Sequence, residues 1–398
     1  MSGHRSTAKT LLRDRKGAHA GRVSYAELFF DLVFVFAVTQ LSHLLIEDFT
    51  PIGALHTLML LLAVWWVWVY TVWVTNWLDP EKLPVRFLLL GLMLVGMVMS
   101  ASVPHAFAER GLVFALAYPA IQVGRSLFFI WAVRREPEML LNFQRIITWQ
   151  SVAAIFWLAG GFQEGNMRLA LWSAALFIDS ISPSTGYWVP GLGRSSTADW
   201  KVEGGHIAER CGLFIIIALG ESLLVTGATF SQMSAWEPTT LAAFAITFSS
   251  SLIMWWLYFD AGADFGSEKI SRSHDPGRLA RLAYTYIHLL LVAGIVVAAV
   301  SDEFVLHHPL GHNDLKTAIS VLGGPALFVL GNLLFKWSLT GRFSLAHLLA
   351  LAALGVLCPF ALHCSPLILI GLATAFLLAL AIWSTFAARR LRKEEYID

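Results

Sequence analysis

The stretch YAELFFDLVFVFAVTQLSHLL (residues 25–45) decides the fold class, because it is apolar enough for a lipid bilayer yet opens with two carboxylates. A helix of about 20 apolar residues spans the ~30 Å hydrocarbon core of a membrane. Such runs recur along nearly the whole 398-residue chain, which is 57% hydrophobic and only 14% charged. The sequence therefore predicts an all-α, polytopic integral membrane protein whose first partner is the lipid bilayer.

Proline, glycine and charged residues divide the apolar runs into about twelve candidate transmembrane helices. These helices cover residues 25–46, 52–77, 85–104, 110–133, 144–161, 167–182, 207–229, 240–261, 279–301, 316–337, 343–362 and 366–388. The implied organisation is a basic cytoplasmic tail (1–22), a first six-helix half (23–190), a cytoplasmic linker (191–206), a second half (207–388) and a cytoplasmic tail (389–398).

Positive charge lies mainly on one side of the predicted spans. With the N-terminus inside, the outer loops hold only Arg110, Arg168 and Lys316, whereas the inner segments are rich in Lys and Arg. Because positive residues resist translocation, this asymmetry predicts a membrane protein with both termini in the cytoplasm.

The predicted outer loops carry acids and histidines. They are Glu47, Asp48, Asp302, Glu303, His307, His308 and His312. The histidines could bind a metal, sense pH or belong to a hydrated loop, so the sequence leaves a metal site open.

An internal repeat is suggested by local alignments of the two halves. YPAIQVGRSLFFIW (118–131) aligns without gaps with GPALFVLGNLLFKW (324–337), and WWVWVY (65–70) pairs with WWLYFD (255–260). Glu27 pairs with Glu209 at the start of the first helix of each half. Since six helices return the chain to the same side, the halves are predicted to be parallel repeats about an axis along the membrane normal.

Polar groups inside the predicted spans are the candidate site, since a charge at mid-bilayer costs roughly 2.5–3.5 kcal/mol on insertion scales. Glu27 fits a first-turn acid, whereas Asp31 lies one turn deeper. In HIAERCGLFIIIALGESLLVTG (206–227), Glu221 lies ~22 Å along the helix from its start. The full set of transport or ion-pair candidates is Glu27, Asp31, Arg125, Asp179, His206, Glu209, Arg210, Glu221, Ser222, His288 and Asn332.

Two expectations concern partners within this set. We expect Arg125 to pair with Glu221 or Asp31, and the alternative for the whole set is ion pairing that only fixes helix register. Gly220, beside Glu221, would permit the close approach of another helix.

ELFFDLVFVFAVTQLSHLL (27–45) and HIAERCGLFIIIALGESLL (206–224) together resemble the bacterial low temperature requirement A (LtrA) family of polytopic membrane proteins. The resemblance extends from about Val23 to Phe386. It places the family motifs on Glu27, Phe30, Asp31, His206, Glu209, Arg210, Gly220, Glu221 and Ser222. The family name reports a growth phenotype, and no biochemical activity follows from it.

A weaker resemblance is to the endosomal and lysosomal potassium channel family, which is built from two six-helix repeats whose first helices carry a Phe-Ser-Asp motif and line the pore. Asp31 would match the aspartate of that motif and Phe30 replaces its serine. Gly212 and Leu213 depart from the motif in the second half.

Three functional classes follow. The first is an ion or proton-coupled channel or transporter with a path between the first and seventh helices, whose partner is a small cation or proton. The second is a membrane-embedded lipid-modifying enzyme using Glu221, His206 and His288 as acid/base groups. The third is a non-transporting sensor or scaffold for low-temperature adaptation. Absence of P-loop, GxSxG, HExxH and CxxC motifs disfavours an enzyme, and neither a cofactor nor a nucleic-acid partner is expected.

Overall fold

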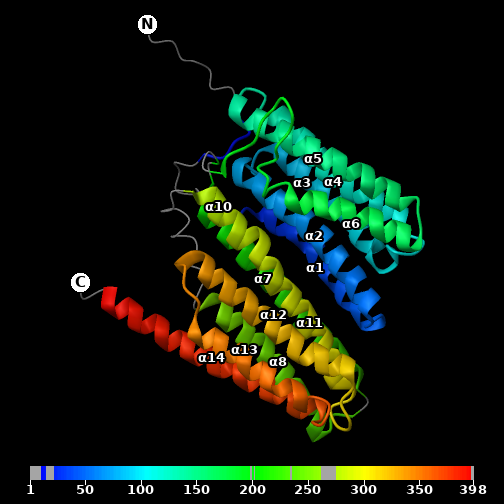
Figure 1. The fold of residues 1–398 in the computed structure, drawn as a ribbon, viewed down its shortest axis with the longest axis vertical. Helices are drawn as coiled ribbons and strands as arrows, with labels where there is room; N and C mark the ends of the chain where they lie inside the picture. The colour runs from blue at the N-terminus through cyan, green and yellow to red at the C-terminus, as the bar shows by residue number, and fades with distance from the viewer. Residues whose placement is uncertain are drawn as a thin grey trace. The chain divides into compact units, whose positions relative to one another are not determined.

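The computed structural model describes residues 10–14, 22–197, 200, 202–233, 235–260 and 275–395, and every regular element in these ranges is a helix (Figure 1). The elements are α1 (Tyr25–Glu47), α2 (Pro51–Trp77), α3 (Leu83–Ser102), η1 (Val103–His105), α4 (Gly111–Ala132), α5 (Pro137–Gly161), α6 (Gly165–Ile181), α7 (Gly204–Gln232), α8 (Pro238–Phe259), α10 (Pro276–Ala280), η3 (Arg281–Ile287), α11 (His288–His307), α12 (Leu315–Thr340), α13 (Leu345–Leu357), η4 (Cys358–Phe360) and α14 (Pro366–Glu395). The predicted all-helical class is confirmed.

Nine helices among these residues are long and apolar enough to cross a membrane, with α10, η3 and α11 forming one of them (Pro276–His307). The predicted bounds agree with the helices to within a few residues, with three larger differences, one of which is that α14 continues to Glu395 rather than ending at 388. α5 begins at Pro137 rather than near 144, because a proline suits the first turn of a helix. α11 continues to His307 rather than ending at 301, because Phe304, Val305 and Leu306 extend its apolar run.

The chain divides into two compact units. The first comprises residues 1–37 and 62–206, and the second comprises 38–61 and 207–398. The end of α1 and the start of α2 therefore group with α8–α14 and with α7 from Ile207 onward. The rest of both helices, with residues 204–206 of α7, groups with α3–α6. The predicted domain boundaries and the two six-helix repeats stay predictions.

The first unit has an aromatic core. α3, α4, α5 and α6 pack in chain order (Figure 1). Trp172 lies against Phe114 and Trp157 with ring centroids 5.4 and 5.2 Å apart, and its Nε1–H donates to the carbonyl of Trp157 at 3.1 Å. The indole N–H is thus satisfied inside the bundle, as a buried tryptophan requires.

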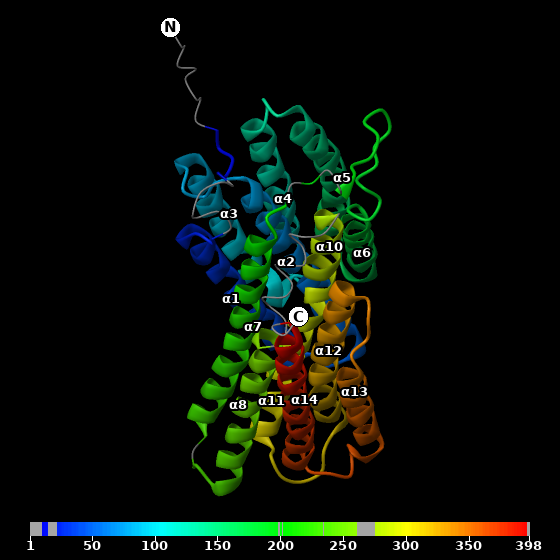
Figure 2. The ribbon, with the colours of Figure 1, turned by 90° about the vertical axis from the view of Figure 1, so that its left-hand side faces the viewer.

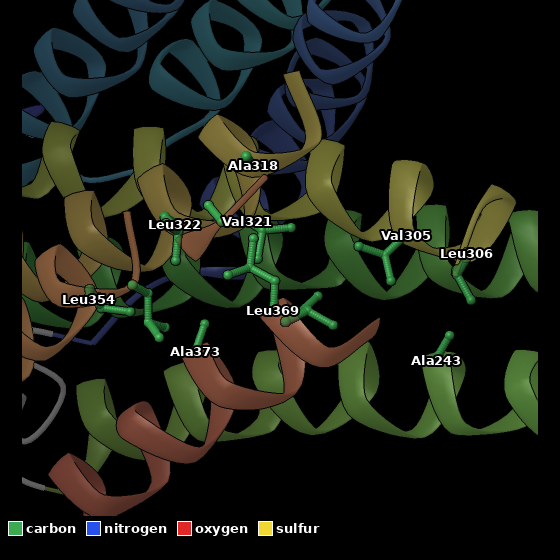
Figure 3. Close-up of a cluster of buried hydrophobic side chains, with 12 residues drawn as sticks. Ala243, Val305, Leu306, Ala318, Val321, Leu322, Leu354, Leu369 and Ala373 are labelled. Carbon is green, nitrogen blue, oxygen red and sulfur yellow. The ribbon is translucent and has the colours of Figure 1, made fainter. Parts of the chain in front are cut away.

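The second unit is built mainly from α8, α11, α12, α13 and α14, which lie side by side (Figure 2). A cluster of buried aliphatic side chains joins them, including Val305 of α11, Val321 of α12, Leu354 of α13 and Leu369 of α14 (Figure 3). α11 and α12 approach most closely at Gly294 and Gly324, where a Cβ atom would lie within 3 Å of the opposite backbone. Small residues permit such contacts between membrane helices.

The close approach expected at Gly220 is wrong for the residues the structure describes. A Cβ atom at Gly220 would meet nothing within 4 Å. Glycines of α11 and α12 have this role instead, because their faces are turned toward each other.

Asp314 caps α12. Its carboxylate Oδ1 accepts the amide N–H of Thr317 at 2.9 Å. Partial burial works to raise the pKa of Asp314, but the hydrogen bonds from Thr317 and the nearby charges of Lys316 and His308 outweigh it and lower that pKa.

We expect Asp314→Ala to lower the free energy of unfolding by about 1 kcal/mol at neutral pH, the usual cost of losing an N-cap. Because folding lowers the pKa, the charged form stabilises the fold above the unfolded-state pKa, and this contribution is lost as pH falls through the folded-state value. Unfolding in mixed micelles at several pH values measures the difference. Asp314→Asn, which keeps a side-chain acceptor, should retain more of the stability; equal loss in both variants would contradict the cap.

Candidate functional site

A buried polar site lies where α1 begins, entirely within the first unit. Ser24 and Glu27 form a capping box: Ser24 Oγ accepts the amide N–H of Glu27 at 3.3 Å, and Glu27 Oε2 accepts that of Ser24 at 2.8 Å. Glu27 Oε1 lies 2.8 Å from Nε2 of His206 in α7, and Oε2 accepts from Arg13 Nη2 at 2.7 Å. Glu27 is therefore the predicted helix-start acid and, in addition, a fully buried ion-pair partner.

Two further groups complete this end of the first unit. Nδ1 of His206 lies 3.2 Å from Nδ2 of Asn76, which also donates to the Glu203 carbonyl at 2.9 Å. One turn deeper in α1, buried Asp31 accepts from Nε1 of Trp68 at 2.8 Å. Both helix-1 carboxylates thus have protein donors.

The expected pairing of Arg125 with Asp31 is wrong, and the pairing with Glu221, a residue of the second unit, stays a prediction. Arg125 is fully buried and donates to the carbonyl of Val67 and to Thr71 Oγ1, both at 3.0 Å, and to Gln122. Its guanidinium also lies 5.3 Å from the ring centroid of Tyr70. Helix α2 thus supplies a carbonyl oxygen, a hydroxyl oxygen and an aromatic face to the cation, and the groups that contact it within the described part of the first unit are not carboxylates.

A hydrogen-bonded chain links this cation to Asp179. Gln122, which accepts from Arg125, donates to Tyr118 Oη at 3.1 Å, and Tyr118 donates to Asp179 Oδ2 at 2.8 Å. Trp157 Nε1 also lies 3.3 Å from that oxygen. Sequence reasoning missed Tyr118 and Gln122, although they lie seven and three residues before Arg125, a spacing that marks one helix face.

Glu221 lies in the middle of α7, inside the second unit. Its carboxylate is buried and Oε2 accepts from Thr39 of α1. His43, one turn further along α1, is close enough to interact electrostatically. Among the residues that the structure describes, Oε1 has no hydrogen-bond partner.

A second carboxylate of the same unit, Asp302, was predicted to lie in an outer loop, and that prediction is wrong. Asp302 is buried in α11, and its Oδ2 accepts from Ser222 at 2.9 Å and from Thr226 at 3.3 Å. Ser222 lies 2.9 Å from Ser251 of α8 through their hydroxyls. The signal in the sequence was the apolar run that continues after Asp302 and requires the helix to continue.

The remaining candidates are His288, Asn332, Glu209 and Arg210. His288 lies 2.8 Å from both the Tyr258 hydroxyl and the Ala283 carbonyl, and Asn332 donates to the Phe328 carbonyl of its own helix. Glu209 is exposed, and Arg210 is fully buried.

The histidines near the end of α11 line a pocket without forming a metal cluster. His307, His308 and His312, with Glu303 and Asp314, border a cavity of about 350 Å³. No group of three or more His, Cys, Asp or Glu in the described parts of the chain is arranged to hold a metal ion.

Apolar helices of membrane-spanning length, with carboxylates buried among them, define a multi-pass membrane protein. The sequence model of the family described as bacterial low temperature requirement A protein (LtrA) matches residues 22–382, and the chain belongs to that family. It is similar to an uncharacterized protein of Rhizobium meliloti (strain 1021), with 39% identity over 377 residues that cover 94% of this chain and 91% of that protein. No solved structure matches it significantly.

Proposed function

We propose that the protein moves protons or small cations along a path lined by α1 and α7. Glu221 carries this proposal. Its carboxylate is buried in a membrane-length helix, and among the described residues no Lys or Arg pairs with it. An ionised carboxylate in apolar surroundings is costly unless it binds a cation, and the alternative is to hold a proton. In either state, the Glu221 carboxylate can take up and release a cation or a proton.

The contacts between α1 and α7 support a path along this helix pair. Glu27 meets His206 within the first unit, and Thr39 meets Glu221 within the second. Those contacts are separated by twelve residues on α1, or ~18 Å, and by fifteen on α7, or ~22 Å. Acidic and hydroxyl groups therefore recur along one helix pair.

Asp302 supplies a second place for the same cargo. Its carboxylate is surrounded by the hydroxyls of Ser222 and Thr226, with Ser251 beyond Ser222. Oxygen atoms of this kind suit a hard cation or a shared proton, and Ser222 follows Glu221 directly in α7.

Parallel repeats are part of the proposal. Thr39 and Glu221 are 182 residues apart, which is also the offset between Glu27 and Glu209 in the aligned first helices of the two halves. Equivalent positions of a parallel repeat can meet only close to the repeat axis, so their contact is what the repeat predicts there. Pro119 inside α4 and Pro325 inside α12 also coincide in the alignment.

The proposed location is the bacterial inner membrane with both termini in the cytoplasm. The Lys and Arg asymmetry supports it. Arg168, assigned to an outer loop on sequence grounds, instead lies buried in α6 and donates to the carbonyls of Gln163, Ala106 and Ala108. Because backbone oxygens accept from Arg168, the predicted outer side has fewer free positive charges.

We expect Glu221→Gln and Asp302→Asn each to reduce ion or proton flux at least about tenfold, a change of only about 1.4 kcal/mol in barrier height. The amides keep the size of the side chains but cannot carry the charge. Purified protein in liposomes with an internal pH-sensitive dye, under imposed Na⁺ or K⁺ gradients, measures the flux.

Glu303→Gln is the matched control. Glu303 follows Asp302 in α11 but is only half-buried, and the hydroxyls of Ser222 and Thr226 donate to Asp302 instead. Its flux should equal that of the wild type. If Glu221→Gln and Asp302→Asn both show wild-type flux, the transport proposal is contradicted and a sensor or scaffold is favoured.

A further inference from the structure

A short extended segment, residues 10–14, lies against the end of α2 in the first unit. The Arg13 amide donates to the Trp77 carbonyl and the Asp79 amide donates to the Leu11 carbonyl, both at 2.8 Å. Leu12 and Leu78 form an antiparallel bridge between these two bonds. This ladder fixes where the Arg13 side chain points.

The Arg13 guanidinium fills a site made mainly of oxygen atoms. Its Nε lies 2.7 Å from the carbonyl oxygen of Thr75 and 3.3 Å from that of Leu78, and Nη1 donates to the carbonyl of Arg22 at 3.0 Å. Nη2 lies 2.7 Å from Glu27 Oε2 and 3.1 Å from His206 Nε2. Only 12% of the side chain is exposed.

These acceptors form a ligand set for a monovalent cation. A carboxylate with backbone carbonyl oxygens replaces the hydration shell of such an ion. Thr75 and Leu78 lie at the carboxyl end of α2, where the helix dipole also favours positive charge. The charge and the oxygen ligands of the site therefore favour a positively charged occupant, and the Arg13 guanidinium supplies that charge.

The site does not depend on Arg13 for its shape. Glu27 is also held by the amide and hydroxyl of Ser24, at 2.8 and 3.0 Å, and by His206. His206 in turn lies next to Asn76. Departure of Arg13 would leave an organised carboxylate facing three carbonyl oxygens.

We propose that Arg13 is a tethered cation occupying a binding site for a free monovalent cation, and that segment 10–14 closes this site until it is displaced. The biological meaning rests on the proposed cation path, since the site adjoins α1 and α7, but the site itself is independent of flux. The ligand class is an alkali cation or a guanidinium-type organic cation.

The test compares melting temperatures of the full chain in detergent as KCl, NaCl or low guanidinium chloride replaces choline chloride at constant ionic strength. Arg13→Ala should be stabilised by several degrees as the small cation is added, because ligand binding to the folded state raises its stability. Wild type should not respond, since its site is filled. Arg13→Ala combined with Glu27→Gln should also not respond, because the carboxylate charge is gone.

Two controls separate this site from general salt effects. Arg22→Ala removes an exposed side chain while keeping the carbonyl that Arg13 uses, and it should behave like wild type. Arg13→Lys keeps a tethered charge and should respond less than Arg13→Ala.

A response of Arg13→Ala no larger than that of the double variant, or an equal response in wild type, would overturn the inference. If Arg13→Ala fails to fold in choline, recovery with guanidinium supports the site, and failure to recover with any of the three cations counts against it. None of these results depends on whether Glu221 or Asp302 supports flux, so the two proposals fail separately.

Discussion

Replacing Glu27 by alanine is expected to lower the free energy of unfolding by about 3–5 kcal/mol, the usual cost of breaking a buried ion pair by removing one partner. The carboxylate is fully buried and is contacted by Arg13 Nη2 at 2.7 Å and by His206 Nε2 at 2.8 Å. Without it, a guanidinium and an imidazole are left beside each other with no negative charge between them. Reversible unfolding in mixed micelles measures the difference.

Two variants divide this effect into its parts. Ser24→Ala removes only the hydroxyl side of the capping box and should cost about 0.5–2 kcal/mol. Arg13→Ala with Glu27→Gln removes both charges and should cost less than Glu27→Ala alone, because no unpaired charge remains buried. A Glu27→Ala loss no greater than that of Ser24→Ala would mean that the ion pair contributes nothing to the fold.

A single methyl group at Gly324 is expected to destabilise the second unit by about 1–3 kcal/mol, the range for overpacking. The added Cβ atom would lie 2.7 Å from the amide nitrogen and 2.9 Å from the Cα of Ala298 on α11. These are backbone atoms, so no side chain can rotate away and the two helices must separate. The loss of packing reaches the buried cluster that joins α11 and α12 to their neighbours.

Gly323 is the matched control, since it is the preceding residue of the same helix and a Cβ atom there would meet nothing within 4 Å. Alanine is the better helix former by up to about 1 kcal/mol, so Gly323→Ala should be neutral or stabilising. Alanine substitutions at these two adjacent glycines should therefore have opposite effects on the free energy of unfolding. The same sign for both substitutions in thermal unfolding would contradict the close approach of α11 and α12.

Hydropathy was sufficient to predict the helices, because a membrane helix must satisfy its own backbone and cover about 30 Å with apolar side chains. Hydropathy failed at Asp302, because the two adjacent acids Asp302 and Glu303 were interpreted as the end of a membrane span. The carboxylate stays inside α11 because Ser222 and Thr226 donate to it. Those donors come from another helix, and no local pattern contains them.

Partners within the candidate site were predictable only where they are close in sequence. Glu27 was predicted as a first-turn acid, and the spacing of Ser24 three residues before it could have indicated the capping box. The structure adds Arg13 and His206 from 14 and 179 residues away. Arg125 shows the limit most clearly. Its burial and charge suggested a carboxylate partner, but its acceptors are carbonyl, hydroxyl and amide oxygens of α2 and α4.

The sequence by itself determined that this chain is helical, membrane-embedded and of the LtrA family, because apolar length and local motifs are properties of contiguous residues. Only the tertiary structure decided which groups meet: Thr39 with Glu221, Ser222 with Asp302, and Arg13 with Glu27. The reason is geometric. A span fixes depth and helix face, while the choice among several compatible donors depends on how neighbouring helices are rotated and how closely their smallest residues let them pack.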